Sequence, residues 1–389
     1  MNSHILDIEI QDYITNYSNP TSKLAFAGSP FLQVTVQELI QQIESRRKIK
    51  TKLPTWYKNE RLYYPPKLNL EQTSSELTAK YKASLISGDS LADITGGFGV
   101  DSYYFSEKFK TVEYFEINEE LSKIARHNFN ILGKSNIKCF MNSGLDAIWN
   151  KKYDFIYADP SRRHDKKGKV YLLADCEPSI PENIHQLLAQ CEVLMLKTSP
   201  MLDISAGLVE LSRVYQIHVV AVNNEVKELV WLLKKDWDEQ PEIFAINLKK
   251  DATETFNFKW RTLAETSYGA PLKYLYEPNA AILKSGAFSL PSEEFRVDKL
   301  HKHSHLYTST TLQDFPGRRF LIEQVVSYSK SEIRKNINFK TANITTRNFP
   351  ESVASLRKKW KIGEGGNRYL FFTTIENQKK VVIICSKVT

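Results

Sequence analysis

An acid and a glycine-rich turn follow a short apolar run in the stretch Leu91–Asp101, LADITGGFGVD. A strand ending at Asp93 would pass into a loop whose glycines let the backbone turn sharply and come close to a bound molecule. A helix beginning at Val100 would complete the strand, loop and helix order of a cofactor site. Glycine-rich turns are also common in ordinary loops, so this stretch alone leaves both interpretations open.

A second acid lies where the ribose of a cofactor would bind. Glu116 directly follows the β-prone run Thr111–Phe115, and doubly wound folds place an acid at this position to accept ribose hydroxyls. A dinucleotide is disfavoured, because Ser102 stands where that fingerprint requires Gly or Ala. The two stretches together favour a nucleotide-like cofactor that is not a nicotinamide dinucleotide.

A reacting position is indicated by Asp159-Pro160, which follows the apolar strand candidate 153–158. The proline ring fixes the backbone at the strand tip, although Asp-Pro pairs also begin ordinary turns. We expect the Asp159 carboxylate and the Pro160 carbonyl to orient a reacting group by accepting hydrogen bonds from it. The basic segment that follows, SRRHDKKGK, would supply Arg162 and Arg163 to grip a phosphate or stack on a base.

Two further groups of residues could do chemistry, and both are weaker candidates. Cys176 could act as a nucleophile, but it has no recognisable partner, and buried inert cysteines are commoner. His301, His303 and His305 alternate, so they would share one face of a strand. No fourth ligand is apparent, and we therefore expect no metal.

The elements that must position these residues alternate between β-rich runs and amphipathic segments from Ser90 to about Leu248. This order is typical of a parallel sheet with helices on both faces. We predict seven strands, near residues 90–93, 111–116, 137–141, 153–158, 192–197, 214–222 and 242–248. We predict helices at residues 100–109, 118–132, 181–190, 203–211 and 225–236.

The first 70 residues look helical and separate from the sheet. Thr35–Glu38 and Thr73–Glu76 both have the pattern of a capping box, and the second would open a helix through about Ile86. Tyr81 and Lys82 on that helix would either overhang the glycine loop or simply pack. The basic run Arg46–Lys52 is a solvated helix end or a nucleic-acid contact.

The composition is that of a globular protein with two or three domains in 389 residues. No apolar run approaches a membrane span, the start lacks a signal-peptide pattern, and the four cysteines form no CxxC pair, so we expect a cytoplasmic protein. Of the net charge of +8, residues 251–389 carry +9, with 22 Lys and Arg against 13 acids. This asymmetry suggests a polyanion partner, although a solvated lysine-rich surface is the alternative.

Beyond Asp251 the strands become shorter and richer in aromatic residues, which predicts one or two small α+β units. We predict helices at Lys330–Ile337 and Glu351–Lys361, and strands at Phe320–Tyr328, Thr341–Thr346, Tyr369–Ile375 and Lys380–Ser386. Basic residues gather on these elements and would form a surface for RNA.

These motifs together resemble the class I S-adenosylmethionine-dependent methyltransferases. Asp93–Gly99 is similar to the first motif of that superfamily, Glu116 to its ribose-binding acid, and Asp159–Arg162 to the motif after its fourth strand. More narrowly, the chain is similar to a bacterial group that carries a ferredoxin-like domain and a THUMP-like C-terminal domain. The stretches that carry this likeness are Thr78–Lys82, Lys197–Asp203, Ala221–Leu229, Tyr274–Asn279, Leu306–Ser309 and Phe315–Arg318.

The resemblance implies an α/β fold: a seven-stranded Rossmann-like methyltransferase sheet with a helical N-terminal region and a small α+β THUMP-like module. The expected domains are a helical region at 1–70, the methyltransferase at 71–250, a ferredoxin-like connecting domain at 251–318 and an RNA-binding module at 319–389. The implied cofactor is S-adenosylmethionine, bound by Lys82, Asp93, Thr95, Gly96, Gly97, Gly99, Asp101, Glu116, Asn142, Ser143 and Asp159. The implied catalytic residues are Asp159, Pro160 and Arg162, and the RNA contacts are Arg162, Arg163, Arg318, Arg319, Arg357, Lys358 and Lys359.

Two departures from the superfamily pattern bear on this expectation. Asn142 and Ser143 replace the acid that contacts adenine, which bears on cofactor affinity, and Ser161-Arg162 replaces a Pro-aromatic pair, which leaves the acceptor atom open. We expect a methyltransferase acting on structured RNA, either tRNA or rRNA. The alternatives are an RNA-binding or assembly protein with little turnover, and a small-molecule methyltransferase.

Overall fold

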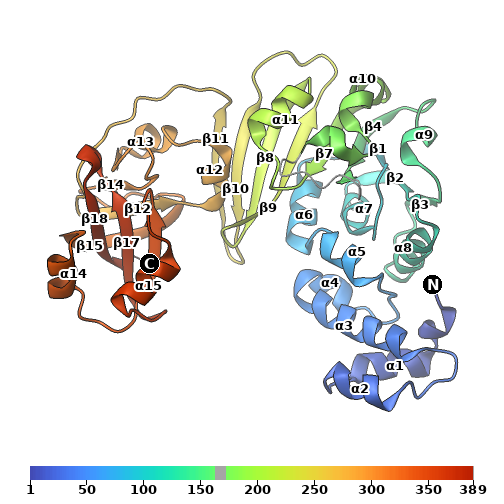
Figure 1. The fold of residues 1–389 in the computed structure, drawn as a ribbon. Coiled ribbons are helices and arrows are strands. Elements are labelled where there is room, and N and C mark those ends of the chain that lie inside the picture. Colours follow the sequence, from blue (N-terminus) through green and yellow to red (C-terminus); the bar gives the residue numbers. More distant parts are fainter. Residues whose placement is uncertain (163–171, 389) are drawn as a thin grey trace. The chain divides into compact units, whose positions relative to one another are not determined.

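The computed structural model describes residues 1–162 and 172–388. The chain forms two compact units (Figure 1). The first comprises Met1–Ile217 and Glu228–Glu239, and the second comprises His218–Lys227 and Gln240–Thr389. Arg163 and most of the basic segment after Asp159-Pro160 lie outside the described residues.

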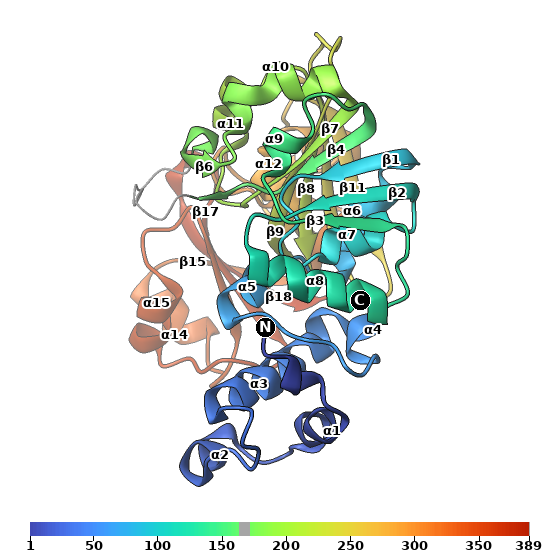
Figure 2. The same cartoon turned by 90° about the vertical axis from the view of Figure 1, so that its right-hand side faces the viewer.

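The first unit is built on a largely parallel sheet, seen in Figure 2. The strands run in the order β3 (Ile137–Phe140), β2 (Phe109–Phe115), β1 (Gly88–Asp93), β4 (Tyr153–Ala158) and β7 (Cys191–Thr198), and β9 (Glu225–Leu233) pairs antiparallel with β7. The strand order reverses between β1 and β4, which is where ligands of such sheets bind. The associated helices are α7 (Val100–Phe105), α8 (Glu119–Ile131), α9 (Gly144–Ala147), α10 (Ile180–Gln190) and α11 (Ile204–Glu210). The predicted methyltransferase-like sheet is therefore confirmed, although it has nine strands among the described residues and not seven.

The helix predicted at residues 225–236 is wrong. This segment is strand β9, joined to β8 (Val214–Val222) through Asn223 and Asn224, whose φ angles are +50° and +68°. Two consecutive left-handed residues are typical of a tight hairpin turn, and asparagine tolerates that conformation. The apolar residues 229–233 are all buried, so their run reflects a strand covered on both faces and not a helical stripe. The strand predicted at 242–248 exists as β10 (Glu242–Leu248) and pairs with β11 (Thr253–Lys259).

The N-terminal region is helical, as predicted. Thr35 and Glu38 form a complete capping box at the start of α3. The capping box predicted at Thr73–Glu76 is wrong in detail, because α6 is capped by Ser75, whose hydroxyl accepts a bond from the Thr78 N–H, and not by Thr73. The helices are α1 (Ile8–Asn16), α2 (Thr21–Ala27), α3 (Val36–Lys52), α4 (Pro54–Tyr57), α5 (Lys67–Gln72) and α6 (Glu76–Ser84).

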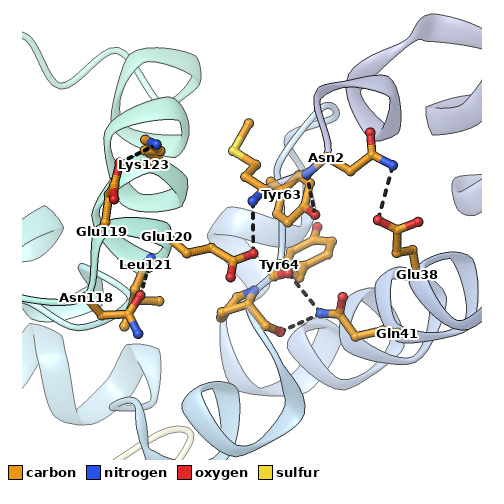
Figure 3. A network of polar contacts seen from close by, with 12 residues as sticks. Asn2, Glu38, Gln41, Tyr63, Tyr64, Asn118, Glu119, Glu120, Leu121 and Lys123 are labelled. Atoms are coloured by element: carbon orange, nitrogen blue, oxygen red, sulfur yellow. Dashed lines mark hydrogen bonds and ion pairs between the residues drawn. The ribbon is translucent and has the colours of Figure 1, made fainter. Parts of the chain in front are cut away.

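An extended segment through Tyr63 and Tyr64 ties these helices to the sheet unit. The buried Asn128 amide on α8 accepts from the Tyr63 N–H and donates to its carbonyl, both at 2.9 Å. The buried Gln42 amide on α3 does the same for Tyr64, at 3.0 and 2.8 Å. Figure 3 shows neighbouring bonds that hold the same segment, including Gln41 to the Tyr64 carbonyl. Side-chain amides thus replace the missing strand neighbours of this buried backbone.

The second unit contains a seven-stranded sheet in the order β13-β14-β12-β15-β18-β17-β16. The central strand pairs, β12 (Tyr274–Pro278) with β15 (Gly317–Ser327) and β15 with β18 (Lys380–Lys387), are antiparallel. The strands and helices predicted beyond residue 319 are confirmed as β15, β16 (Asn343–Arg347), β17 (Arg368–Thr374), β18, α14 (Lys330–Asn336) and α15 (Val353–Trp360).

The three alternating histidines do not share a strand face. The chain turns at residues 302–304, where Ser304 is buried, and His305 has a φ of +50° with its ring stacked 3.9 Å from Phe288. Burial lowers the pKa of His305 to about 4. Among residues 1–162 and 172–388, no group of three or more potential metal ligands comes together. Nor does any helix of the described chain have both the length and the apolar character to cross a membrane.

Asn128→Ala tests the amide clamp. It leaves the buried Tyr63 N–H and C=O without partners, so we expect the free energy of unfolding to fall by about 2–4 kcal/mol, at about 1–3 kcal/mol for each orphaned group. Denaturant unfolding followed by circular dichroism measures the change. The control is Asn130→Ala on the exposed side of the same helix, expected within about 0.5 kcal/mol of wild type. Equal effects of the two variants would contradict the clamp.

Candidate active site

The glycine loop lies between the carboxyl ends of β1 and β2, where it turns tightly. Gly97 and Gly99 have φ angles of +57° and +86°. A Cβ at Gly96 would stand 2.2 Å from the Tyr114 ring, and one at Gly99 would stand 2.4 Å from Phe129. Packing therefore explains two of the three glycines. Gly97 is different, since the nearest atom to an added Cβ would be the Thr95 carbonyl oxygen at 3.7 Å.

Glu116 lies beside this open glycine, at the end of β2. One carboxylate oxygen accepts from the Gly97 N–H at 2.8 Å, and the other accepts from the Asn118 N–H at 2.7 Å. A carboxylate oxygen has more than one lone pair, so both remain able to accept hydroxyl groups. At the end of the next strand, Asn142 is exposed and Ser143 is half-buried, with its hydroxyl accepting from the Asp146 N–H at the start of α9.

Asp93 is buried at the end of β1, with a relative exposure of 1%. Its carboxylate accepts from the Ser102 hydroxyl at 2.5 Å and from the Thr95 N–H at 3.1 Å. Burial raises the pKa of Asp93 to about 7, and the nearby acids Asp101 and Asp159 add to the rise. The site therefore contains a carboxyl group that changes charge near neutral pH.

A buried ion network lies behind the glycine loop. The Lys82 side chain on α6 is fully buried, and its ammonium contacts Asp101 at 3.2 Å, Glu228 at 2.7 Å and Ser74 at 3.1 Å. Asp101 also accepts from the hydroxyls of Ser74 and Tyr157, each at 2.8 Å. Burial raises the pKa of Asp101, but the charges of Lys82 and Lys197 outweigh it and hold that pKa below its ordinary value. Lys82, expected at the cofactor, instead supports the wall of the loop.

Asp159 is held at the tip of β4 by two contacts. Its N–H donates to the Thr95 hydroxyl at 2.7 Å, which joins the β4 tip to the glycine loop. Its carboxylate is paired with the Lys197 ammonium at the end of β7. Burial of Lys197 disfavours its charged form, but the negative charges of Asp159, Glu228 and Asp101 outweigh this effect and raise the pKa of Lys197. The Asp159 side chain remains 33% exposed, so it can still meet a substrate.

Sequence reasoning noted Lys197 and Glu228 within motifs but did not assign them to the site. Lys197 directly follows the apolar run 193–196 and Glu228 directly precedes the apolar run 229–233, so a charged residue at the end of a buried run is the signal that could have found them. Their partners could not be read from the sequence, because Glu228 meets Lys82 across 146 residues.

The network carries a surplus of negative charge. Four carboxyl groups, on Asp93, Asp101, Asp159 and Glu228, surround two ammonium groups, on Lys82 and Lys197. Even with Asp93 protonated, one negative charge remains uncompensated within this set. A cationic ligand would complement it. These residues, with Glu116 as a ribose acceptor and the open Gly97, fit S-adenosylmethionine, which is positively charged at its sulfonium.

The remaining predicted site residues are placed as follows. Pro160 is buried, and the backbone of Arg162 lies in β5 (Ser161–Arg162), paired with β6 (Cys176–Glu177). Cys176 is a buried free cysteine.

Most of the expected RNA contacts are engaged within the second unit. Arg318 donates to Glu277 at 2.5 Å, and Arg319 pairs with Asp314 at 3.1 Å. Arg357 donates to backbone carbonyls, including that of Gly363 at 2.6 Å. Lys359 pairs with Glu351 at 3.0 Å, and Lys358 is exposed. These bonds show that several of the arginines and lysines have structural roles.

The chain resembles known proteins in both units. Residues 317–387 match the THUMP domain-like family, and residues 274–316 match a ferredoxin-like domain family. The crystal structure of a protein from Porphyromonas gingivalis W83, provisionally named a methyltransferase, is 32% identical, with a TM-score of 0.90 over 100% of both chains. The comparison with curated proteins found no match.

Smaller methylases resemble only part of the chain. An rRNA methylase from Streptococcus thermophilus is 18% identical over 41% of this chain and 94% of its own, with a TM-score of 0.31. A provisionally named methyltransferase from Streptococcus mutans, in complex with SAH, is 16% identical over 41% of this chain and 96% of its own, with a TM-score of 0.29. At these scores neither structure bears on the site.

The strand order and the full-length relative define a class I S-adenosylmethionine-dependent methyltransferase fold. The chain belongs to the same family as the Porphyromonas gingivalis protein, the bacterial group of this class with ferredoxin-like and THUMP-like C-terminal domains.

Asp93→Asn tests the raised pKa. The pKa of Asp93 is about 7 in the folded protein, which is above its value of about 4 in the unfolded chain. Between these two pH values the folded protein holds a proton on Asp93 that the unfolded chain has released. Wild-type stability therefore falls between about pH 4 and 7. We expect the variant, which cannot ionise there, to gain about 2–4 kcal/mol relative to wild type across this range.

Denaturant titrations at several pH values measure this difference. Asp89→Asn, at a 72% exposed carboxyl, serves as the control and should run parallel to wild type. A constant difference between Asp93→Asn and wild type at all pH values would refute a raised pKa.

Proposed function

We propose that this protein transfers a methyl group from S-adenosylmethionine to a base of structured RNA, either tRNA or rRNA, in the cytoplasm. The observation that carries the proposal is the surplus of negative charge at the tips of β1, β4 and β7, next to the loop of Gly97 and Glu116. A site of this charge favours a cationic methyl donor. The match of residues 317–387 to the THUMP domain-like family supports RNA as the acceptor.

The side chains of the site have separate roles in this proposal. S-adenosylmethionine supplies an electrophilic methyl group, so the protein mainly has to align the acceptor and exclude water. Glu116 accepts the ribose hydroxyls, and the Gly97 backbone allows close approach. The surplus negative charge of Asp93 and the ion network would favour the positive sulfonium of the donor. Asp159 and the Pro160 carbonyl accept N–H groups of the base and aim its lone pair.

Arg162 and Arg163, which follow Asp159-Pro160 in the sequence, would grip the RNA backbone or stack on a base. In the C-terminal module, Lys358 has the exposed ammonium that phosphate contact requires. The other expected contacts, Arg318, Arg319, Arg357 and Lys359, are engaged within the second unit. Fewer side chains of this module are therefore free to contact RNA than the net charge of +9 over residues 251–389 suggests.

A second candidate is an RNA-binding protein with little turnover. Asn142 is exposed and the Ser143 hydroxyl is occupied at the helix start, so neither supplies the carboxylate that the superfamily uses at adenine. Weak binding of S-adenosylmethionine would follow from the absence of this carboxylate.

Calorimetric titration of the protein with S-adenosylmethionine, followed by mass spectrometry of nucleosides from RNA incubated with both, separates the two candidates. We expect binding and the appearance of one methylated nucleoside. Asp159→Asn should still bind the cofactor, although more weakly because one carboxylate of the network is lost, and should slow transfer at least about 100-fold, the usual scale for a positioned acid–base group. Binding without any transfer by wild type would favour the second candidate, and absence of binding would rule out the first.

Lys197→Met tests the support of Asp159. Loss of the ammonium removes the ion pair that holds the Asp159 carboxylate at the β4 tip, so the acceptor should be aligned less well. Transfer at pH 7 should fall at least about tenfold, since a small misplacement of a reacting group can cost about 100-fold. Lys197→Arg, which keeps a cation that can donate to Asp159, should retain more of the activity. If both variants lose activity equally, lost packing and not the ion pair accounts for the effect.

A further inference from the structure

A long segment of concentrated positive charge lies in the N-terminal helical region. Residues 45–70 contain eight Lys and Arg against one acid, Glu60. The balance of −1 over residues 1–250 conceals this segment, because acids elsewhere in those residues cancel its charge. The charge falls on the second half of α3, on the segment that follows α4 and on the first residue of α5.

Some of these cations are used within the protein. Arg47 donates to the backbone carbonyls of Tyr17 and Asn19, at 2.9 and 2.7 Å. Lys48 pairs with Glu71 at 2.7 Å, and Lys52 donates to the Leu70 carbonyl at 2.8 Å. These three residues hold helices together and are not available to a partner.

Three other cations gather around the half-buried Tyr57 on α4. The Arg46 guanidinium carbon lies 4.7 Å from the centre of the Tyr57 ring, and the Lys50 ammonium lies 5.9 Å from it. Lys58 is the next residue and is exposed. Within residues 1–162 and 172–388, none of the three forms an ion pair with a carboxylate. We call Arg46, Lys50, Tyr57 and Lys58 the α3–α4 basic face.

This face is attached to the glycine loop through buried contacts. Trp56, which precedes Tyr57, is fully buried, and its ring lies 5.1 Å from Phe98 of the glycine loop and 5.4 Å from Tyr103 of α7. Thr55 donates through its N–H and hydroxyl to Glu76 of α6, at 2.8 and 2.7 Å. Figure 1 shows α3, α4 and α6 following one another in the first unit. A partner bound to this face is therefore held by the unit that contains the active site.

We infer that the α3–α4 basic face binds the phosphate backbone of the RNA substrate, as a second RNA contact on the catalytic unit. The inference rests on the proposed function. Cations that form no ion pair with a carboxylate of the described chain favour a polyanion, and RNA is the polyanion that the proposed reaction brings to this unit. The contacts with Tyr57 restrain the two long side chains, which reduces the entropy lost when they close on phosphates. Phosphate contacts position the substrate without reading its sequence.

The test compares two double variants of the full-length protein by fluorescence anisotropy with labelled bulk tRNA over a range of salt concentrations. The first is Arg46→Ala with Lys50→Ala. The control is Lys108→Ala with Lys110→Ala, which removes the same charge from exposed positions at the amino end of β2, away from the carboxyl ends that form the site. Calorimetric titration with S-adenosylmethionine serves as the folding check for both.

We expect the first variant to bind tRNA at least about fivefold more weakly at low salt and its salt-dependence slope to shrink by about 1.4–1.8, at about 0.7–0.9 per phosphate contact. The control should keep both values close to wild type, and both variants should bind the cofactor as wild type does. An unchanged slope for the first variant, or equal losses in the two variants, would overturn the inference. Wild-type protein that does not bind tRNA at any salt concentration would instead count against the proposed function.

Discussion

The structure depends on the neutralisation of Lys82 inside the first unit. An ammonium with no exposed surface is stable only if opposite charges accompany it, because an unpaired buried charge costs several kcal/mol. Its partners come from α7 and β9, through Asp101 and Glu228. Asp101 in turn binds Tyr157 of β4. The buried ammonium of Lys82 thus joins α6, which precedes the glycine loop, to α7, which follows it, and to the strands β9 and β4. These contacts hold the glycine loop in place from behind.

The sequence was sufficient for the parts of the site that follow local rules. Asp93, Glu116 and Asp159 each follow an apolar strand, and the structure places all three at strand ends of one sheet. Their long-range partners were beyond sequence reasoning. The spacing does not tell that Lys197 faces Asp159 or that Glu228 faces Lys82, because these pairs form only when the sheet assembles. The three-dimensional structure therefore changed the role of Lys82 from a cofactor contact to a support.

The wrong prediction at residues 225–236 has a similar cause. Val226, Leu229, Val230 and Leu233 have helical spacing, but β9 is buried by neighbours that the sequence does not name. The Asn223-Asn224 turn was the local signal for a hairpin. The buried segment at Tyr63 and Tyr64 could be read as extended from its prolines, yet its pairing with the Asn128 and Gln42 amides could not. Local turn chemistry is legible in the sequence, whereas burial depends on the assembled fold.

The charges of the active site and of the α3–α4 basic face have opposite signs, and this contrast limits what can enter the site under the proposed function. Phosphates are repelled by the carboxylates around Asp159 and attracted by Arg46 and Lys50. A neutral base is not repelled by these carboxylates, and its N–H groups can donate hydrogen bonds to Asp159. The RNA backbone would therefore be held at the basic face and by Arg162 and Arg163, while a base leaves the stack and enters, at a cost of a few kcal/mol for unstacking. The backbone contacts at the basic face must offset that cost, which links the N-terminal helices to the reaction although none of their side chains needs to touch the reacting atoms.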